Sequence, residues 1–485
     1  MLKHKTLARR MAALAALLCA LALAWGALAE GPMDFTGWLN GDAAPAASAP
    51  AAAAPEIQVE VEAQPEAPQA EAIEAQPEAP QAEPIEAQPE APQAEAIEAQ
   101  PEAPQAEAIE TQPEAPVPAA VEAVQSPFGP EPTLEPPQPL RSARIRAVGD
   151  LMVHKKQLAV AKRSDGSYDF HDQYALIAGS LADADYTLAN LETTVGRYRS
   201  LDYSGYPMFN TPESLLETVK DAGVDFLTLA NNHMLDRYFE GLMNTVSWVE
   251  QYGFDFGGAN RSPEERNAAK VVYVNGIGIG LLCYTQMTNG MESYCNSAVE
   301  EYAVNYLRKA DFAADVQRLR DAGADVVIAL PHWGEEYRRK PEPNTVALAK
   351  LMIASGVDVI LGSHPHMVQP VEFVEAQTPE GGTRTGLVAY SLGNFISNMS
   401  VRHTDSGIIL QFTVQERQDG SFGIDDVCCV PVYCWRSAAN VQPLSSLKYL
   451  DNPPRDMDAA ARRRMAQSYQ ELRDLLDDSI LLLAE

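Results

Sequence analysis

Side chains of the kinds that bind metal ions and transfer protons gather in five short clusters, each directly after a short apolar run. The clusters are Gly149-Asp150, Asn190-Leu191-Glu192, Asn231-Asn232-His233, His332-Trp333-Gly334 and His364-Pro365-His366. Carboxylates offer charge, and neutral imidazoles offer nitrogen ligands that suit divalent transition metals. Two such ions ~3.5–4 Å apart can orient a water and stabilise an in-line displacement. The clusters therefore predict a site for one or two divalent ions, with Mn, Fe and Zn as candidates.

Each cluster has a simpler explanation when it is considered alone. A Gly-Asp pair after a strand is common in turns, and the Asn and His residues at 231–233 can equally cap the following helix. His364 and His366 are a stronger signal, because alternate residues of an extended segment point the same way. His154 follows Asp150 closely in the sequence and is a further candidate. The prediction of a polar site depends on the clusters converging.

The elements that must position these clusters alternate along the chain. Short β-rich runs alternate with helical stretches, which is typical of an α/β fold. The runs before the five clusters are Ile145–Val148, Tyr186–Ala189, Phe226–Leu229, Val326–Leu330 and Val357–Leu361. Ligands of α/β sheets bind at the carboxyl ends of the strands, which is where all five clusters fall.

Further elements complete the predicted domain. Helices are expected at Leu235–Tyr252, Tyr302–Ala322, Val346–Ser355 and Ala459–Leu483. Asn275-Gly276 is a hairpin turn signal between two strands, Val271–Val274 and Ile277–Tyr284. Antiparallel strands are expected at Val371–Val374, Leu387–Ser391 and Gly407–Gln415. We place the domain at 141–440, with a helical segment at 441–485 packing on it. A disulfide between Cys428 and Cys434 is one possibility.

The N-terminus has the pattern of an export signal at 1–29. Basic residues precede an apolar segment, Met11–Ala24, and Ala27-Leu28-Ala29 is a small-x-small cleavage motif. The alternative is an uncleaved anchor, because the stretch from 11 to 29 carries no charge and about 20 apolar residues span a bilayer. Either interpretation predicts an extracellular or cell-surface protein.

Residues 30–140 form a low-complexity linker. A unit close to IEAQPEAPQAEA begins at Val61 and recurs at Ile73, Ile85 and Ile97 before it decays after Ile109. This composition is too polar and Pro-rich to bury a core, so we expect an extended, disordered segment. It is either a spacer that carries the domain away from a membrane or a tolerated tail. The chain has a net charge of −31 and lacks the basic surface that nucleic acid requires.

Six motifs, in this order, together resemble the bacterial CapA-like family of poly-γ-glutamate capsule synthesis. They are GDLM (149–152), NLE (190–192), ANNHMLD (230–236), HWGEEY (332–337), GSHPHMVQPVE (362–372) and YSLGNF (390–395). The match spans roughly Arg144 to Asn398. The family is related to calcineurin-like metallophosphoesterases, so the resemblance implies a four-layer αββα sandwich.

The resemblance also implies roles for individual residues. The implied metal ligands are Asp150, Glu192, Asn232, His332, His364 and His366. His233 takes the place of the acid that faces the leaving group, with Asp236 as a second catalytic residue. The candidate substrate-binding residues are Asn231, Trp333, Glu336, Tyr337 and Asn394. Two positions depart from the superfamily pattern: Met152 stands where a histidine ligand is usual, and Glu192 stands where an aspartate is usual.

The resemblance implies a role in polyglutamate capsule assembly or export. One hypothesis is a metal-dependent hydrolase or transferase acting on a phosphoester or a polyglutamate amide. The other is a non-catalytic scaffold or accessory subunit that has lost its metals, which Met152 favours. Poly-γ-glutamate or another anionic envelope polymer is the expected partner, together with membrane synthase subunits. Substrate, reaction and metal count stay open.

Overall fold

The structure is a computed structural model that describes residues 140–197, 202–477 and 480–483. The predicted signal segment at 1–29 and, apart from Leu140, the predicted linker at 30–140 lie outside the described residues. Across the described ranges, every helix falls short of the length and apolarity that a membrane crossing requires. All of the described residues belong to one unit of the chain.

The larger of two main sheets is built around β1 (Ser142–Leu151). Its strand order is β16-β15-β14-β1-β2-β5-β6, with β13 beside β1 and β17 beside β15. The bounds are β2 Tyr186–Leu191, β5 Phe226–Thr228, β6 Asp255–Gly257, β13 Asn394–Ile396, β14 Ser406–Glu416, β15 Phe422–Arg436, β16 Val441–Ser445 and β17 Leu481–Leu482. Strands β1, β2, β5 and β6 are parallel, so their carboxyl ends lie along one edge. Every residue of β2 is buried, as expected for a central parallel strand.

The smaller sheet has the strand order β11-β12-β10-β9-β8-β7. Its strands are β7 Val271–Val274, β8 Ile277–Thr285, β9 Val326–His332, β10 Val359–Leu361, β11 Val371–Gln377 and β12 Thr383–Ala389. Strands β8, β9, β10 and β12 are parallel. The hairpin between β7 and β8 turns at Asn275 and Gly276, whose φ angles are 50° and 78°. The Asn-Gly turn prediction is thus confirmed.

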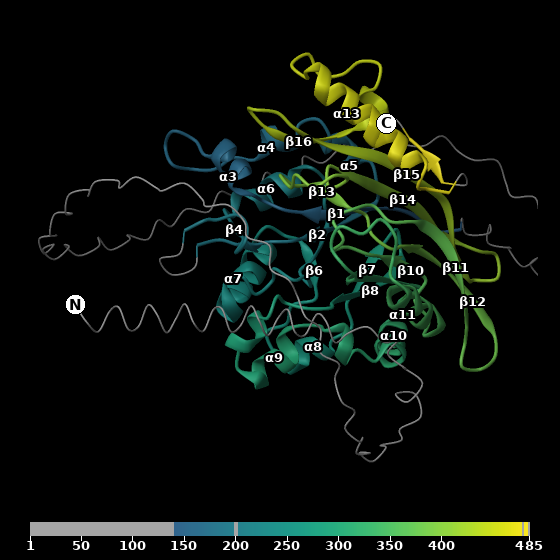
Figure 1. Ribbon diagram of the computed structural model, residues 1–485. Coiled ribbons are helices and arrows are strands. Elements are labelled where there is room, and N and C mark those ends of the chain that lie inside the picture. Colours follow the sequence, from purple (N-terminus) through teal and green to yellow (C-terminus); the bar gives the residue numbers. More distant parts are fainter. Residues whose placement is uncertain (1–139, 198–201, 478–479, 484–485) are drawn as a thin grey trace, which may run out of the picture. The chain divides into compact units, whose positions relative to one another are not determined.

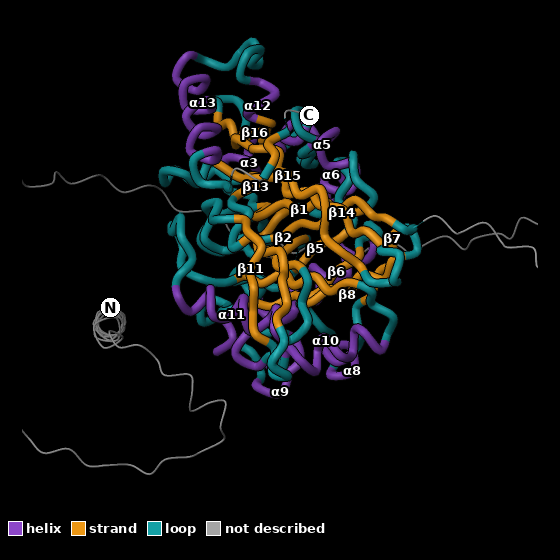
Figure 2. The backbone as a smooth tube through the Cα atoms, turned by 90° about the vertical axis from the view of Figure 1, so that its right-hand side faces the viewer, coloured by secondary structure: helices purple, strands orange, loops and turns teal. Residues whose placement is uncertain are grey.

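The two sheets stack between two layers of helices. One apolar core, which includes Ile145, Leu188, Ile328 and Leu361, lies between the sheets. A second core covers the outer face of the large sheet with three helices: α3 (Lys155–Ala161), α6 (Ser214–Asp221) and α7 (Tyr238–Gln251). A third core covers the outer face of the small sheet with α10 (Phe312–Asp321) and α11 (Pro343–Ala354). Figure 2 shows the strands gathered in the middle, with α3, α5 and α6 above them and α10 and α11 below. The predicted four-layer αββα arrangement is confirmed.

The helices of these layers are mostly short (Figure 1). Their bounds are α3 Lys155–Ala161, α4 His171–Tyr174, α5 Ala178–Ala182, α6 Ser214–Asp221, α7 Tyr238–Gln251, α8 Pro263–Asn267, α9 Ser297–Ala303, α10 Phe312–Asp321, α11 Pro343–Ala354, α12 Ser446–Tyr449 and α13 Ala459–Arg473. A two-stranded ribbon, β3 Thr194–Val195 with β4 Asn210–Thr211, completes the domain.

Two predicted helices have different bounds in the structure. The helix expected from Tyr302 is interrupted: α9 ends at Ala303, and α10 begins only after Asp311, whose side chain accepts a hydrogen bond from the Ala314 amide and caps it. The helix expected to reach Leu483 ends at Arg473, because the chain then returns to the large sheet as β17 beside β15.

The C-terminal part of the chain is also less helical than predicted. The segment at 441–485 opens with β16, which pairs antiparallel with β15 in the large sheet. Cys428 and Cys434 both lie buried on β15, and neither belongs to a disulfide. Six residues along a strand span roughly 20 Å, far beyond disulfide reach, so the possible bridge between them is wrong.

Candidate metal centre

The carboxyl ends of five strands from both sheets deliver the predicted clusters to one place. Strand β1 ends just past Asp150, and β9 ends at His332. Asn190 and Leu191 end β2 and Glu192 follows it, whereas the remaining two clusters begin three residues past the ends of β5 and β10. Gly149 permits the close approach of β13 to β1, because a Cβ there would lie 1.9 Å from the Gly393 carbonyl oxygen. That approach sets Asn394 beside Asp150 in the strand register.

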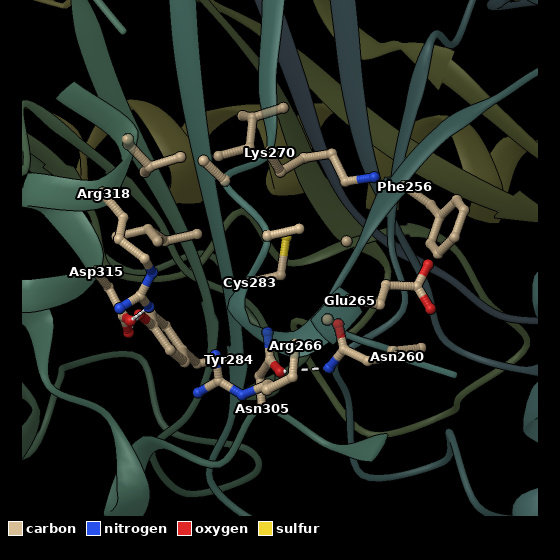
Figure 3. A pocket seen from close by; sticks show the side chains of 18 residues that line it. Phe256, Asn260, Glu265, Arg266, Lys270, Cys283, Tyr284, Asn305, Asp315 and Arg318 are labelled. Atoms are coloured by element: carbon tan, nitrogen blue, oxygen red, sulfur yellow. Dashed lines mark hydrogen bonds and ion pairs between the residues drawn. The ribbon is translucent and has the colours of Figure 1, made fainter. Parts of the chain in front are cut away.

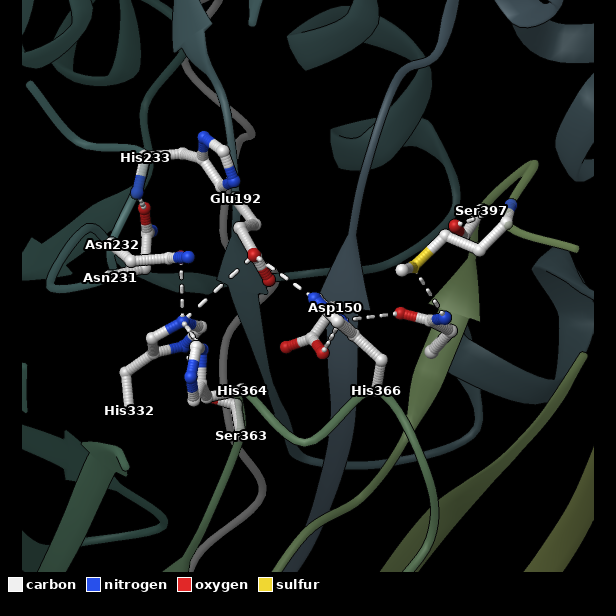
Figure 4. Close-up of polar contacts among 12 residues, drawn as sticks. Asp150, Glu192, Asn231, Asn232, His233, His332, Ser363, His364, His366 and Ser397 are labelled. Atoms are coloured by element: carbon white, nitrogen blue, oxygen red, sulfur yellow. Dashed lines mark hydrogen bonds and ion pairs between the residues drawn. The ribbon is translucent and has the colours of Figure 1, made fainter. Parts of the chain in front are cut away.

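The centre of the site contains two carboxylates and an imidazole. Ligand atoms of Asp150, Glu192 and His332 all lie within 4.8 Å of one another, and all three residues are buried (Figure 4). Asp150 Oδ1 accepts a 2.8 Å hydrogen bond from Asn190 Nδ2, and its Oδ2 lies 3.0 Å from His366 Nδ1. Glu192 Oε1 lies 3.9 Å from His332 Nε2 and 3.8 Å from His366 Nε2, with no hydrogen-bond partner among the described residues.

Burial controls the protonation states at this centre. Burial, followed by the neighbouring Asp150 carboxylate, raises the pKa of Glu192 well above its usual value. Burial and adjacent imidazoles lower the pKa of His332 well below its usual value and that of His364 to about 4. These two imidazoles are therefore neutral, which is the form that binds metal ions. A divalent cation between the carboxylates would remove the cost of burying their charge.

The histidines are oriented by neighbouring polar groups. His332 Nδ1 lies 2.8 Å from Ser363 Oγ, and its Nε2 lies 2.9 Å from Asn232 Oδ1 and 3.2 Å from His364 Nδ1. His364 and His366 have φ angles of 99° and 57°, a left-handed backbone that non-glycine residues rarely adopt. The expectation that extended alternation aims both imidazoles is therefore wrong, since a turn with left-handed residues brings them to the centre.

His233 forms a pair with Asp236 beside this centre. Its Nδ1 lies 2.8 Å from Asp236 Oδ2, which also accepts a 2.6 Å hydrogen bond from the Phe209 amide. The Phe209 ring meets the imidazole edge-on at 4.7 Å between centroids. Helix α7 begins at Tyr238 with Arg237 in the capping position, so the alternative that His233 caps this helix is wrong.

Two of the predicted substrate-binding residues are internal supports of the site. Asn231 is fully buried, and its Nδ2 donates to Asn190 Oδ1 at 3.2 Å and to the Leu191 carbonyl at 2.8 Å. Asn394 is also fully buried, with Oδ1 3.1 Å from His366 Nδ1. Asn394 therefore orients the candidate ligand His366, whereas Asn231 holds Asn190 and the His233 backbone, and both amides are buried.

The other three predicted substrate-binding residues separate into two groups. Trp333 is buried on the far side of β9, where its indole N–H donates to the Tyr390 carbonyl at 2.9 Å, so the structure does not bring it to the site. Glu336 and Tyr337 are exposed. The Tyr337 ring lies 6.3 Å from the His366 ring, and partial burial with nearby Glu336 raises the pKa of Tyr337 to about 12. These two residues lie at the solvent side of the site.

The structure adds two residues to which the sequence assigned no role. Asn190 donates from one amide nitrogen to Asp150 at 2.8 Å and to Glu192 at 3.4 Å, and so holds the carboxylates together. Ser363 bonds the ring nitrogen of His332 that points away from the centre. Asn190 lies in the NLE motif and Ser363 in the GSHPH motif, so their positions within these motifs are the sequence signal for such a role.

The position of the missing histidine ligand is occupied by an apolar side chain. Met152 is buried at the end of β1. His154 does not replace the missing ligand, because its Nε2 lies 3.2 Å from Ser397 Oγ and its ring meets Phe209 edge-on. Burial lowers the pKa of His154 to about 4. His154 is a neighbour of the centre outside its compact ligand cluster.

A family model and two relatives of known name agree on one protein family. Residues 144–399 match the family model described as bacterial capsule synthesis protein PGA_cap. The chain is 28% identical over 279 residues to the capsule biosynthesis protein CapA of Bacillus anthracis, covering 56% of this chain and 63% of that protein. It is 26% identical over 287 residues to the PGA biosynthesis protein CapA of Bacillus subtilis, covering 58% and 70%. The chain thus spans less than two thirds of the first relative.

Two solved structures are weakly similar. The NAD nucleotidase of Haemophilus influenzae gives a TM-score of 0.36 at 12% identity, covering 72% of this chain and 65% of that one. The calcineurin-like phosphoesterase YfkN of Bacillus subtilis gives 0.34 at 15% identity, covering 69% and 99%.

Proposed function

Because this chain belongs to the bacterial capsule synthesis protein PGA_cap family, we propose that its folded domain works in the synthesis or export of a poly-γ-glutamate capsule polymer at the cell surface. The names of the two CapA relatives, for capsule and for PGA biosynthesis, support this role. The export pattern at 1–29 supports the location. The proposed partners are the anionic polymer itself and membrane synthase subunits.

We propose further that the domain carries a metal-dependent hydrolase-like site. One observation carries this proposal: Glu192 Oε1 is a buried carboxylate oxygen with no hydrogen bond, within reach of His332 and His366. A buried carboxylate oxygen without a partner is costly unless a cation neutralises it. The donor set of two carboxylates, an amide oxygen and neutral imidazoles fits Mn, Fe or Zn. Asp150, Glu192 and His332 would hold the ion.

The chain's own residues prepare an acid beside this centre. A bound divalent ion would supply Lewis acidity and a water of lowered pKa. The Asp236 carboxylate accepts a hydrogen bond from the Nδ1–H group of His233, so the Nε2 atom of the ring is the one left to face a substrate. A proton held at Nε2 can then pass to a leaving oxygen or nitrogen. Phe209 packs on the imidazole and excludes water from that side. Hydrolysis of a phosphoester or of a γ-glutamyl amide is the reaction class.

A second candidate function is a non-catalytic scaffold of polymer assembly. The observation that favours it is Met152, whose buried thioether takes the place of a nitrogen ligand that His154 does not supply. A centre with one ligand fewer would bind metal less tightly, and its fold could persist without turnover.

Elemental analysis of the purified full chain tests the metal site. We expect close to one metal equivalent or more, and a rise in the unfolding midpoint when Mn²⁺ or Zn²⁺ is added to stripped protein. The Glu192→Gln variant should lose both the bound metal and the rise in unfolding midpoint. The Glu335→Gln variant, an exposed control, should keep both. Metal content below ~0.2 equivalents with no stabilisation by added metal would refute the site. Metal retention without turnover of any phosphodiester or γ-glutamyl amide would instead favour the scaffold.

A further inference from the structure

A pocket lies at the edge of the sandwich, where β6 and β8 meet α8 and α10 (Figure 3). It has a volume of about 100 Å³. None of the residues that line it belongs to the candidate metal centre. The pocket therefore needs an explanation of its own.

The inner wall of this pocket is apolar. Phe256, Leu281, Cys283 and Leu319 line it and are all buried. Burial raises the pKa of the Cys283 thiol to about 12, so this side chain is a neutral part of the wall. Such a wall suits the hydrocarbon part of a ligand better than a bare inorganic ion.

Two cationic side chains line the same pocket without a carboxylate in ion-pair contact. Arg266 and Lys270 are partly buried, and within the described ranges neither forms an ion pair. Lys270 Nζ lies 4.9 Å from the centre of the Phe256 ring, which holds the ammonium at the pocket wall. Two unpaired cations at one small cavity are notable in a chain whose net charge is −31.

The carboxylates of the pocket are already engaged by other cations. Glu265 Oε1 accepts from Arg261 Nη2 at 2.7 Å. Asp315 accepts from Arg318 and from the hydroxyl of Tyr284. Arg261 is shared with Glu250, and Glu265 also interacts electrostatically with Lys270. The charged side chains that line the pocket are three cations and two carboxylates, so one positive charge is left over: Arg266, Lys270 and Arg318 against Glu265 and Asp315.

An amide donor completes the polar side of the pocket. Asn260 Nδ2 donates to Asn305 Oδ1 at 2.8 Å and also to the Tyr302 carbonyl. This contact fixes the orientation of the Asn305 amide, because its oxygen must face Asn260. The Asn305 Nδ2 group is left as a further donor in the lining of the pocket.

We propose that this pocket binds a small organic dianion, namely a dicarboxylate with a short apolar body. Two cations and an amide match two carboxylates, while the apolar wall takes the chain between them. Hydrogen bonds to charged groups are the stronger ones, and an Arg fork suits a carboxylate. The proposal does not depend on the function proposed for the metal centre.

Calorimetric titration of the full chain with glutarate tests the pocket. We expect a dissociation constant of roughly 0.1–1 mM. Glutaramide, the neutral analogue, should not bind measurably. Inorganic phosphate should bind more weakly than glutarate, and tighter phosphate binding would overturn the organic part of the proposal. No heat from glutarate up to about 20 mM would overturn the site altogether.

Substitutions of the lining residues test whether glutarate binds in this pocket. Arg266→Gln and Lys270→Gln should each weaken glutarate about 10-fold or more. Lys350→Gln removes one charge from an exposed position on α11 and should leave the affinity unchanged. An equal loss in Lys350→Gln would mean diffuse charge attraction and would overturn the proposal. Asn305→Asp keeps the bond from Asn260 and repels an anion, so it tests the pocket if the other variants unfold; unchanged affinity there would also refute it.

Discussion

The two sheets contribute different chemistry to the candidate metal centre. The large sheet supplies oxygen donors, Asp150, Glu192 and Asn232, whereas the small sheet supplies imidazoles, His332, His364 and His366. We call these two groups of donors the oxygen half and the imidazole half of the centre. Side-chain contacts join the two halves, such as Asp150 to His366 at 3.0 Å and Asn232 to His332 at 2.9 Å. Neither sheet holds a complete donor set. The centre therefore exists only while the core between the sheets keeps them in register.

The halves also differ in how the backbone positions them. Asp150 lies within β1, and Glu192 directly follows β2, so strand pairing fixes the oxygen half. His364 and His366 lie in a turn with left-handed φ angles that surrounding contacts must hold in place. We therefore expect the imidazole half to respond more strongly to changes in its neighbours.

Loss of one imidazole ligand should have the largest effect. His364→Ala removes a donor that no other described side chain replaces, so metal affinity should fall at least about 100-fold and turnover should disappear. Elemental analysis and metal titration measure the loss. His171→Ala is a matched control, because His171 pairs with Asp169 and Asp221 at the surface. A fully loaded His364→Ala protein would mean that the oxygen half suffices.

The next effect concerns the acid beside the centre. His233→Ala should lower turnover by about 10²–10⁴ while the metal content stays near wild type, because the His233 ring hydrogen-bonds to Asp236 instead of to a candidate ligand. Asp236→Asn should act in the same direction by releasing Nδ1. Turnover of a phosphodiester or γ-glutamyl amide is the measurement. The assignment fails if His233→Ala retains full turnover or empties the site. If no substrate is turned over, polymer production in cells replaces the rate assay.

A smaller effect is expected from the support of His332. Ser363→Ala removes the group 2.8 Å from His332 Nδ1, so metal affinity should fall roughly 10–100-fold while the fold persists. Ser247→Ala, an exposed change on α7, is the matched control. Equal metal affinity in both variants would show that packing alone orients the imidazole half.

The last effect, on stability instead of metal binding, is a pH dependence due to His154. Its folded pKa of about 4 lies below the ordinary value of 6.5, so the unfolded chain binds more protons between these values. Stability should therefore fall as the pH falls from 6.5 towards 4, by on the order of 2–3 kcal/mol in total from this residue. Urea unfolding of metal-free protein at pH 7 and 4.5 measures the slope. His154→Gln should flatten it, and an unchanged slope would assign the dependence to other groups.

The strand ends and their clusters were predictable because buried apolar runs are interrupted by polar residues at those points. The position of Trp333 was predictable in hindsight. It follows His332 at the end of a strand, and successive side chains point to opposite faces. With His332 in the site, Trp333 had to enter the core beyond β9.

Other features had no local signal. The left-handed turn at His364 and His366 depends on tertiary contacts, and so does the direction of His154 past the end of β1. The apolar spacing from Tyr302 to Ala322 favours one helix, whereas Asp311 caps a separate start for α10. The return of the chain as β17 depends on the exposed edge of β15, a partner distant in sequence.

The position of β1 has a consequence for the order of events during synthesis. β1 is the first described strand, yet β14 occupies one of its edges, with Arg146 bonding Gln411 265 residues later. At ~5–20 residues per second, a ribosome needs roughly 13–50 s to make that stretch. During this interval the central strand has no partner on that side. The large sheet can therefore close along this edge of β1 only after β14 has been made, late in the synthesis of the chain.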